Sequence, residues 1–118
     1  MDISEDRKAD AVILALSGKL DATTAKAFEN RILTVIDSGA AQRLVVDLAQ
    51  LDYVSSSGLR VFLLAAKRLQ ATNGKITLCG LQDQVRQVFD LSGFSSIISI
   101  YGSRDEAIKG LSTLATSQ

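Results

Sequence analysis

"RLVVDLAQLDYVSSSGLRVFLLAAKRLQAT", residues 43–72, joins two apolar segments of different periodicity through three consecutive serines. Residues 43–48 form a short apolar run of the kind found in buried β-strands. Residues 57–72 have the length and apolar spacing of a helix, which the Asn73-Gly74 turn ends. A strand that leads into a helix in this way is the repeating unit of α/β proteins.

The same alternation continues upstream of this unit. Residues 11–18 read as a buried central strand that ends at a glycine, and the weakly alternating residues 3–9 as an antiparallel edge strand beside it. Residues 23–37 predict a helix that Gly39 ends. The inward face of this helix is expected to carry the apolar residues that recur at helical spacing, namely Ala25, Phe28, Ile32, Val35 and Ile36.

Downstream, strands and helices alternate again. Residues 75–81 and 95–102 read as strands, residues 83–93 as a helix, and residues 103–114 as a terminal helix that Ser103 caps. Strands that alternate with helices of this length favour a mainly parallel sheet. The predicted fold is therefore α/β, with a mixed but mainly parallel sheet and about four helices.

Length and composition limit the domain count and the classes of partner. A chain of 118 residues with 47% apolar side chains fits one domain over residues 1–118. Lys plus Arg and Asp plus Glu each number 13, so no net charge attracts nucleic acid or a membrane surface. The N-terminus is too polar for a signal peptide and no apolar run could cross a bilayer, so we expect a cytoplasmic protein without membrane insertion.

Residue types that are missing exclude several kinds of chemistry. The chain has no histidine, and therefore lacks the usual general base and the commonest metal ligand. It has neither a Walker motif nor a GxGxxG segment, so we expect no cofactor, no metal and no catalytic residues. The single cysteine, Cys79, lies in an apolar run and reads as a buried, inert thiol.

One edge of the predicted sheet collects the polar residues that could carry a function. In a parallel sheet, the loops that follow the strands meet at the edge formed by the strands' carboxyl ends, where ligands usually bind. Residues 18–24 and 49–58 would be two such loops. We therefore expect the two loops to lie within reach of each other. This would bring Asp21, Thr23 and Thr24 close to Ser55, Ser56 and Ser57.

The three serines allow two interpretations. Serine is a favoured helix N-cap, worth about 1 kcal/mol, and Gly58 would permit close packing of the first turn. One cap needs only one serine, however, and the amides and dipole of a helix N-terminus favour a bound or covalent phosphate. A phosphoserine here would add about 1.5 to 2 negative charges and leave the fold intact, as a reversible switch requires.

The helix after the serines carries a second candidate feature. A helical wheel places Leu59, Phe62, Leu63, Ala66 and Leu69 on one side. On the other side it places Leu64 among basic residues, so Leu64 is either an ordinary exposed leucine or part of a docking surface. The predicted docking surface consists of Arg60, Leu64, Lys67 and Arg68, with Ala71 at its end.

At this point the sequence resembles the STAS-domain anti-sigma factor antagonists, small bacterial proteins that bind, and are phosphorylated by, anti-sigma factor kinases. Two motifs carry the resemblance over nearly the whole chain: "GKLDATTA" is similar to the family's Gly-x-Leu-Asp segment, and "VSSSGLRVFL" to its Asp-Ser-Ser/Thr-Gly-Leu segment. The resemblance implies that Ser56 is the phosphoacceptor and that Asp21 is the loop aspartate. Ser55 stands where the family commonly has an aspartate.

Three functions compete to explain these features. The first is an anti-sigma factor antagonist that binds a serine kinase, is switched off by phosphorylation of Ser56 and is restored by a serine phosphatase. The second is a STAS scaffold or transporter-associated subunit that acts without phosphorylation. The third, a small hydrolase that uses Ser56 with Asp21, is disfavoured because no histidine, motif lysine or evident oxyanion partner is present.

Overall fold

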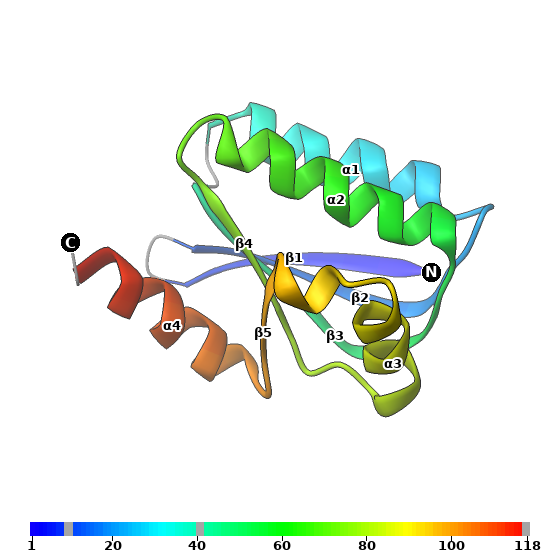
Figure 1. Cartoon of the computed structure of the whole chain (residues 1–118). Helices are drawn as coiled ribbons and strands as arrows, with labels where there is room; N and C mark the ends of the chain where they lie inside the picture. Colours follow the sequence, from blue (N-terminus) through cyan, green and yellow to red (C-terminus); the bar gives the residue numbers. More distant parts are fainter. Residues whose placement is uncertain (9–10, 40–41, 117–118) are drawn as a thin grey trace.

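The computed structural model describes residues 1–8, 11–39 and 42–116, with the backbone alone for residues 111–116. Strands and helices alternate along the chain after an initial pair of strands (Figure 1). In chain order the elements are β1 (Asp2–Lys8), β2 (Ala11–Leu20), α1 (Ala25–Asp37), β3 (Arg43–Val54), α2 (Ser56–Gln70), β4 (Lys75–Cys79), α3 (Asp83–Leu91), the 3-10 turn η1 (Phe94–Ser96), β5 (Ser99–Tyr101) and α4 (Arg104–Thr116).

The sheet is mixed and mainly parallel, as predicted. Its strand order is β1-β2-β3-β4-β5, with β1 antiparallel to β2 and all later neighbours parallel. The predicted edge strand and its antiparallel pairing are therefore confirmed, although Ala9, the last residue of that prediction, lies outside the described residues. Because each parallel strand leads into a helix, the loops that follow the strands gather at one edge of the sheet.

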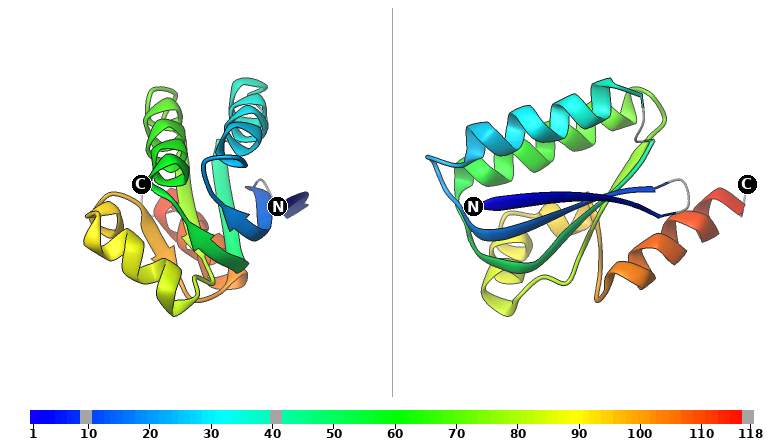
Figure 2. Two further views of the ribbon diagram at one scale, coloured as in Figure 1. Left: turned by 90° about the vertical axis from the view of Figure 1, so that its right-hand side faces the viewer. Right: turned by 180° about the vertical axis from the view of Figure 1, so that it is seen from behind.

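Three helices cover one face of the sheet, and α4 packs on the other (Figures 1 and 2). A row of phenylalanines crosses the first face from helix to helix. Phe28 of α1 lies 5.1 Å from Phe62 of α2, which lies 5.4 Å from Phe89 of α3, and Phe94 of η1 completes the row at 6.1 Å. The first three rings are fully buried, so they fix α2 between α1 and α3.

The core beneath α4 is smaller. There, Ala107 packs against Ile13, Val45 and Cys79, one from each of three neighbouring strands. The predicted burial of Cys79 is confirmed, and this burial, helped by the negative charge of Asp47, raises the pKa of the thiol to about 12. The thiol therefore stays protonated at neutral pH and serves as a small apolar side chain.

Helix α1 confirms its predicted inward face, because all five residues expected there are buried. The inward face of α2 differs from the prediction. Its buried residues include the small residues Gly58 and Ala65, together with Val61. The predicted inward residues Leu59, Leu63 and Ala66 are only half-buried. The helix approaches the sheet through its small residues, a contact that a wheel of large apolar residues does not reveal.

Three strand predictions need correction. Strand β3 continues to Val54, six residues beyond the predicted end, and β2 continues to Leu20. The predicted strand 95–102 is wrong in its first half, because residues 94–96 form η1 and only residues 99–101 pair with β4. Gly93 with φ +82° turns the chain there, and Phe94 turns inward onto Phe89.

Candidate functional site

The strands β2 and β3 extend past the rest of the sheet and carry the two candidate loops. Pairing of β3 with β4 ends at Asp47, whereas pairing of β2 with β3 continues to Leu20 and Val54. The amide of Ser55 then donates to the carbonyl of Leu20 at 2.8 Å. The loop at Asp21 and the serine segment therefore start from adjoining strand ends, as the topology predicted.

Gly58 sets the position of α2 over these strand ends. A Cβ on Gly58 would lie 2.7 Å from Cγ of Leu20 and 3.1 Å from Cγ2 of Val54, closer than normal packing allows. Both neighbours are buried, so neither has free space into which to move. The absence of a side chain at Gly58 thus lets the first turn of α2 rest directly on the ends of β2 and β3.

The three serines have three different environments. Ser55 is the N-cap of α2: its backbone is extended, with φ −93° and ψ 172°, and its Oγ accepts a hydrogen bond from the amide of Gly58 at 3.2 Å. Ser56 is the first helical residue and is exposed, whereas Ser57 is half-buried. Capping therefore accounts for Ser55, and Ser56 presents its hydroxyl to solvent at the helix N-terminus.

The Asp21 loop is a tight turn that its own side chains hold together. Oδ1 of Asp21 accepts from the amide and hydroxyl of Thr23 at 3.0 and 2.7 Å, and from the amide and hydroxyl of Thr24 at 3.2 Å each. The carbonyl of Lys19, 2.9 Å from the hydroxyl oxygen of Thr24, shares the single proton of that hydroxyl with Asp21. Hydrogen bonds from Thr23, above all from its hydroxyl, lower the pKa of Asp21, so the carboxylate is ionised at neutral pH.

The predicted docking surface on α2 divides into two parts. Arg60 and Lys67 are exposed, and neither has a carboxylate partner in the described part of the chain. Leu64 is half-buried rather than fully exposed. Arg68 instead turns toward α1, where its Nη1 donates to both carboxylate oxygens of Asp37 at 3.0 Å.

The extended strand ends also expose residues that the sequence reading placed in a loop. Tyr53 is 49% exposed and pairs with the exposed Lys19 across the β2–β3 ladder. Gln82, in the loop after β4, donates to the carbonyl of Ala49 at 3.0 Å and lies 3.4 Å from Asp52. The signal that could have revealed this strand is the β-forming content of "LDYV" directly after the apolar run.

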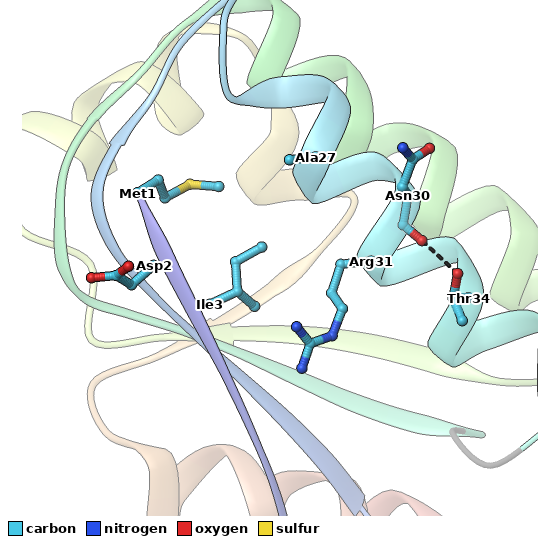
Figure 3. A pocket seen from close by; sticks show the side chains of 7 residues that line it. All are labelled: Met1, Asp2, Ile3, Ala27, Asn30, Arg31 and Thr34. Atoms are coloured by element: carbon cyan, nitrogen blue, oxygen red, sulfur yellow. Dashed lines mark hydrogen bonds between the residues drawn. The ribbon is translucent and has the colours of Figure 1, made fainter.

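A separate, open hollow lies between β1 and α1 (Figure 3). Met1 and Ile3 form its floor below Ala27, and Arg31 reaches from α1 toward the sheet, where it pairs with Glu5 at 3.4 Å. None of the candidate residues from the two loops lines this hollow. It is therefore distinct from the serine segment.

In the described part of the chain, neither a membrane-spanning helix nor a cluster of metal ligands offers an alternative functional site. None of the helices described here is long and apolar enough to cross a membrane. Within residues 1–8, 11–39 and 42–110, no three acidic, histidine or cysteine side chains gather as a metal would require. The serine segment with its neighbouring loop thus remains the strongest candidate site.

Comparison with known proteins gives consistent results. The profile of the STAS domain matches residues 2–107. BtrV of Bordetella bronchiseptica, named as a putative anti-sigma factor antagonist, is 39% identical over 113 residues, which cover 96% of this chain and 97% of BtrV. Solved structures share the fold as well, among them the following two. One is an anti-sigma factor antagonist from Mycobacterium paratuberculosis, with TM-score 0.85, 22% identity and coverage of 92% of each chain. The other is the Bacillus cell fate determinant SpoIIAA in its phosphorylated form, with TM-score 0.74, 24% identity and coverage of 93% of this chain and 99% of SpoIIAA.

Proposed function

Because the chain belongs to the STAS domain family, we propose that it acts as an anti-sigma factor antagonist, like the relatives named above. In this proposal the unphosphorylated protein binds an anti-sigma factor that is also a serine kinase, and so frees a sigma factor. Phosphorylation of Ser56 ends the binding, and a serine phosphatase restores it. The observation that carries the proposal is the exposed hydroxyl of Ser56 at the N-terminus of α2, next to a serine already used as the cap.

The geometry at Ser56 suits a phosphate. The first amides of a helix lack intrahelical partners, and the helix dipole favours negative charge there by about 0.3 to 1 kcal/mol. Helix α2 has no acidic residue in its first turn, so a phosphate would meet no like charge within that turn. We therefore expect phosphorylation to change the surface of the protein and not its fold.

The protein would be the substrate in the transfer reaction, not the enzyme. Oγ of Ser56 forms a bond to the γ-phosphorus of the ATP held by the kinase, the bond from that phosphorus to the ADP oxygen breaks, and the hydroxyl proton passes to a base of the kinase. Such chemistry needs little from the accepting side beyond a positioned hydroxyl. The ionised Asp21, fixed by Thr23 and Thr24, would shape the adjoining loop for the partner.

The surface around Ser56 would supply the docking contacts. Arg60 and Lys67 offer exposed positive charges, Leu64 offers a partly exposed apolar side chain, and Tyr53 adds an aromatic ring from the strand end. Aromatic and arginine side chains are enriched among the residues that dominate binding energies. Of the residues predicted for docking, Arg68 contributes least in this proposal because Asp37 already engages it.

The test compares Ser56→Asp with Ser56→Ala against the cognate anti-sigma factor. Both variants should stay folded by circular dichroism, because each change lies on an exposed first-turn residue. Ser56→Asp should bind much more weakly than wild type, since a charge buried against a partner without a countercharge is costly, while Ser56→Ala should bind but accept no phosphate. Mass spectrometry should find the phosphate on Ser56. Equal affinities of the two folded variants would contradict the phosphorylation switch.

Two further variants separate docking from phosphorylation. Leu64→Asp should weaken partner binding and cost no more than about 1 kcal/mol of stability, because the side chain is only half-buried. Asp21→Asn should impair binding or phosphate transfer while the sheet stays intact. If the protein binds a partner but no kinase modifies it, the alternative of a STAS scaffold that acts without phosphorylation is favoured.

A further inference from the structure

The surface near Ser56 contains a cation that forms no ion pair within the described residues. Arg60 is exposed and follows Ser56 by four residues on α2. The other basic residue of this helix that points toward a neighbouring element, Arg68, is held by Asp37 at 3.0 Å. Arg60 has no such partner on its own helix because the positions three and four residues before it are serines, Ser57 and Ser56, in place of acids.

Helix geometry brings the side chains of Ser56 and Arg60 together. Residues four apart on a helix have Cβ atoms about 5 to 6 Å from each other. Long side chains on a helix tend to point back toward its N-terminus, which puts a phosphate on Ser56 within reach of the guanidinium of Arg60. An acidic group followed four residues later by a basic one is also the favourable order, because it agrees with the helix dipole.

We propose that Arg60 is the ligand within α2 for a phosphate on Ser56, so that phosphorylation both adds negative charge and withdraws the positive charge of Arg60 from the partner. This inference rests on the proposed function, since it assumes phosphorylation at Ser56. The planar guanidinium can donate two parallel hydrogen bonds to phosphate oxygens, which an ammonium cannot do in a fixed geometry. In the unphosphorylated protein the same guanidinium is free to contact an acidic group of the partner.

Other charged groups near the serines are less suited to hold the phosphate. Lys67 lies on the same side of α2 but eleven residues beyond Ser56, roughly 16 Å along the helix axis. Lys19 is exposed at the end of β2 and pairs with Tyr53 in the strand ladder, two residues before the cap. The nearest acidic group of the adjoining loop, Asp21, has its Oδ1 occupied by Thr23 and Thr24 and would repel the phosphate. Arg60 is thus the cation that lies one helical turn from Ser56 on the same face of α2.

The test does not depend on a kinase. Phosphoserine is incorporated at position 56 during synthesis of the full chain, in the wild-type background and with Arg60→Gln, Arg60→Lys or Lys67→Gln. Phosphorus NMR then follows the second ionisation of the phosphate, which has a pKa near 6 in the absence of a partner. We expect this pKa to be lower by roughly 0.3 to 1 in the wild-type background than in the Arg60→Gln variant, and intermediate in the Arg60→Lys variant. Lys67→Gln is the matched control and should leave the pKa unchanged.

Two results would overturn the inference. The first is a phosphate pKa that is the same in the wild-type background and in the Arg60→Gln variant. The second is an equal shift of the phosphate pKa by Arg60→Gln and by Lys67→Gln, which would show only a general effect of positive charge. Neither result bears on the proposed function, which fails instead if the wild-type protein binds no anti-sigma factor or accepts no phosphate from one. The inference also predicts that Ser56→Asp mimics phosphorylation only in part, because one carboxylate carries less charge and reaches Arg60 less well.

Discussion

Replacing Gly58 with alanine tests whether the serine segment is held by close packing against the strand ends. The added methyl group would lie 2.7 Å from Cγ and 2.8 Å from Cδ2 of Leu20, and 3.1 Å from Cγ2 of Val54. Overpacking of this kind in a full core costs about 1 to 3 kcal/mol. Alanine in place of glycine favours the helix by up to about 1 kcal/mol. Because the clash involves a fully buried leucine and a branched valine, we expect a net loss of about 1 to 2 kcal/mol.

Urea unfolding measures this loss directly. For a slope of roughly 1.5 kcal/mol per molar urea, the midpoint should fall by about 1 M with the slope unchanged. Ser57→Ala is the matched control, because it changes the preceding, half-buried residue of the same turn and should stay within about 0.5 kcal/mol of wild type.

A second variant assigns the loss to its cause. Leu20→Ala alone should cost about 2 to 5 kcal/mol, since it empties a buried site. In that background the added methyl at position 58 has space, so Gly58→Ala should become neutral or stabilising, with a coupling of about 1 to 2 kcal/mol between the two changes. If Gly58→Ala were as stable as wild type, or more stable, helix propensity would outweigh the contact and the packing argument would be refuted.

Three further predictions concern the cap, the loop aspartate and the thiol. Ser55→Ala should cost about 1 kcal/mol in urea unfolding, because it leaves the amide of Gly58 without its cap, whereas Ser56→Ala should cost less than about 0.5 kcal/mol. The pKa of Asp21 lies below its ordinary value of 3.8 in the folded protein. The stability that the ionised carboxylate contributes is therefore fully present at pH values above 3.8 and is lost as the pH falls through the folded pKa. Asp21→Asn should therefore weaken the dependence of thermal stability on pH below about 4. Cys79, with a pKa of about 12, should resist thiol reagents at mildly alkaline pH in the folded protein and react with them on unfolding. Rapid labelling of Cys79 in the folded protein would contradict its burial.

The sequence was sufficient for the strands and helices whose apolar pattern is continuous. Residues 43–48 and 11–18 are recognisable because strands buried on both faces are almost uniformly apolar. The ends of β2 and β3 were missed because Lys19 in β2, and Gln50 and Asp52 in β3, interrupt that pattern. The pairing of the two strands with each other keeps them extended there, a tertiary effect that no local pattern records.

The candidate site shows a similar division. Topology alone predicted that the Asp21 loop and the serines would adjoin, and the hydrogen bond from Ser55 to Leu20 bears this out at the level of the backbone. The separate environments of Ser55 and Ser56 could not be read from three identical residues, since each can cap a helix. Which one does so depends on where α2 begins, and Gly58, which has no Cβ to collide with Leu20, allows the first turn to lie against the strand ends there.

The identity of the cap also affects what a phosphate would do. With Ser55 as the cap, the first turn of α2 carries no acidic side chain. The backbone amides that lack intrahelical partners, and the positive end of the helix dipole, therefore face no fixed negative charge in this turn. An aspartate at this position, as is common in the family that the sequence resembles, would already supply such a charge and would stand beside the phosphate as a like charge. A neutral cap makes the phosphate on Ser56 the first anion at this helix end, and the full change in local charge then appears at the surface that the partner would contact.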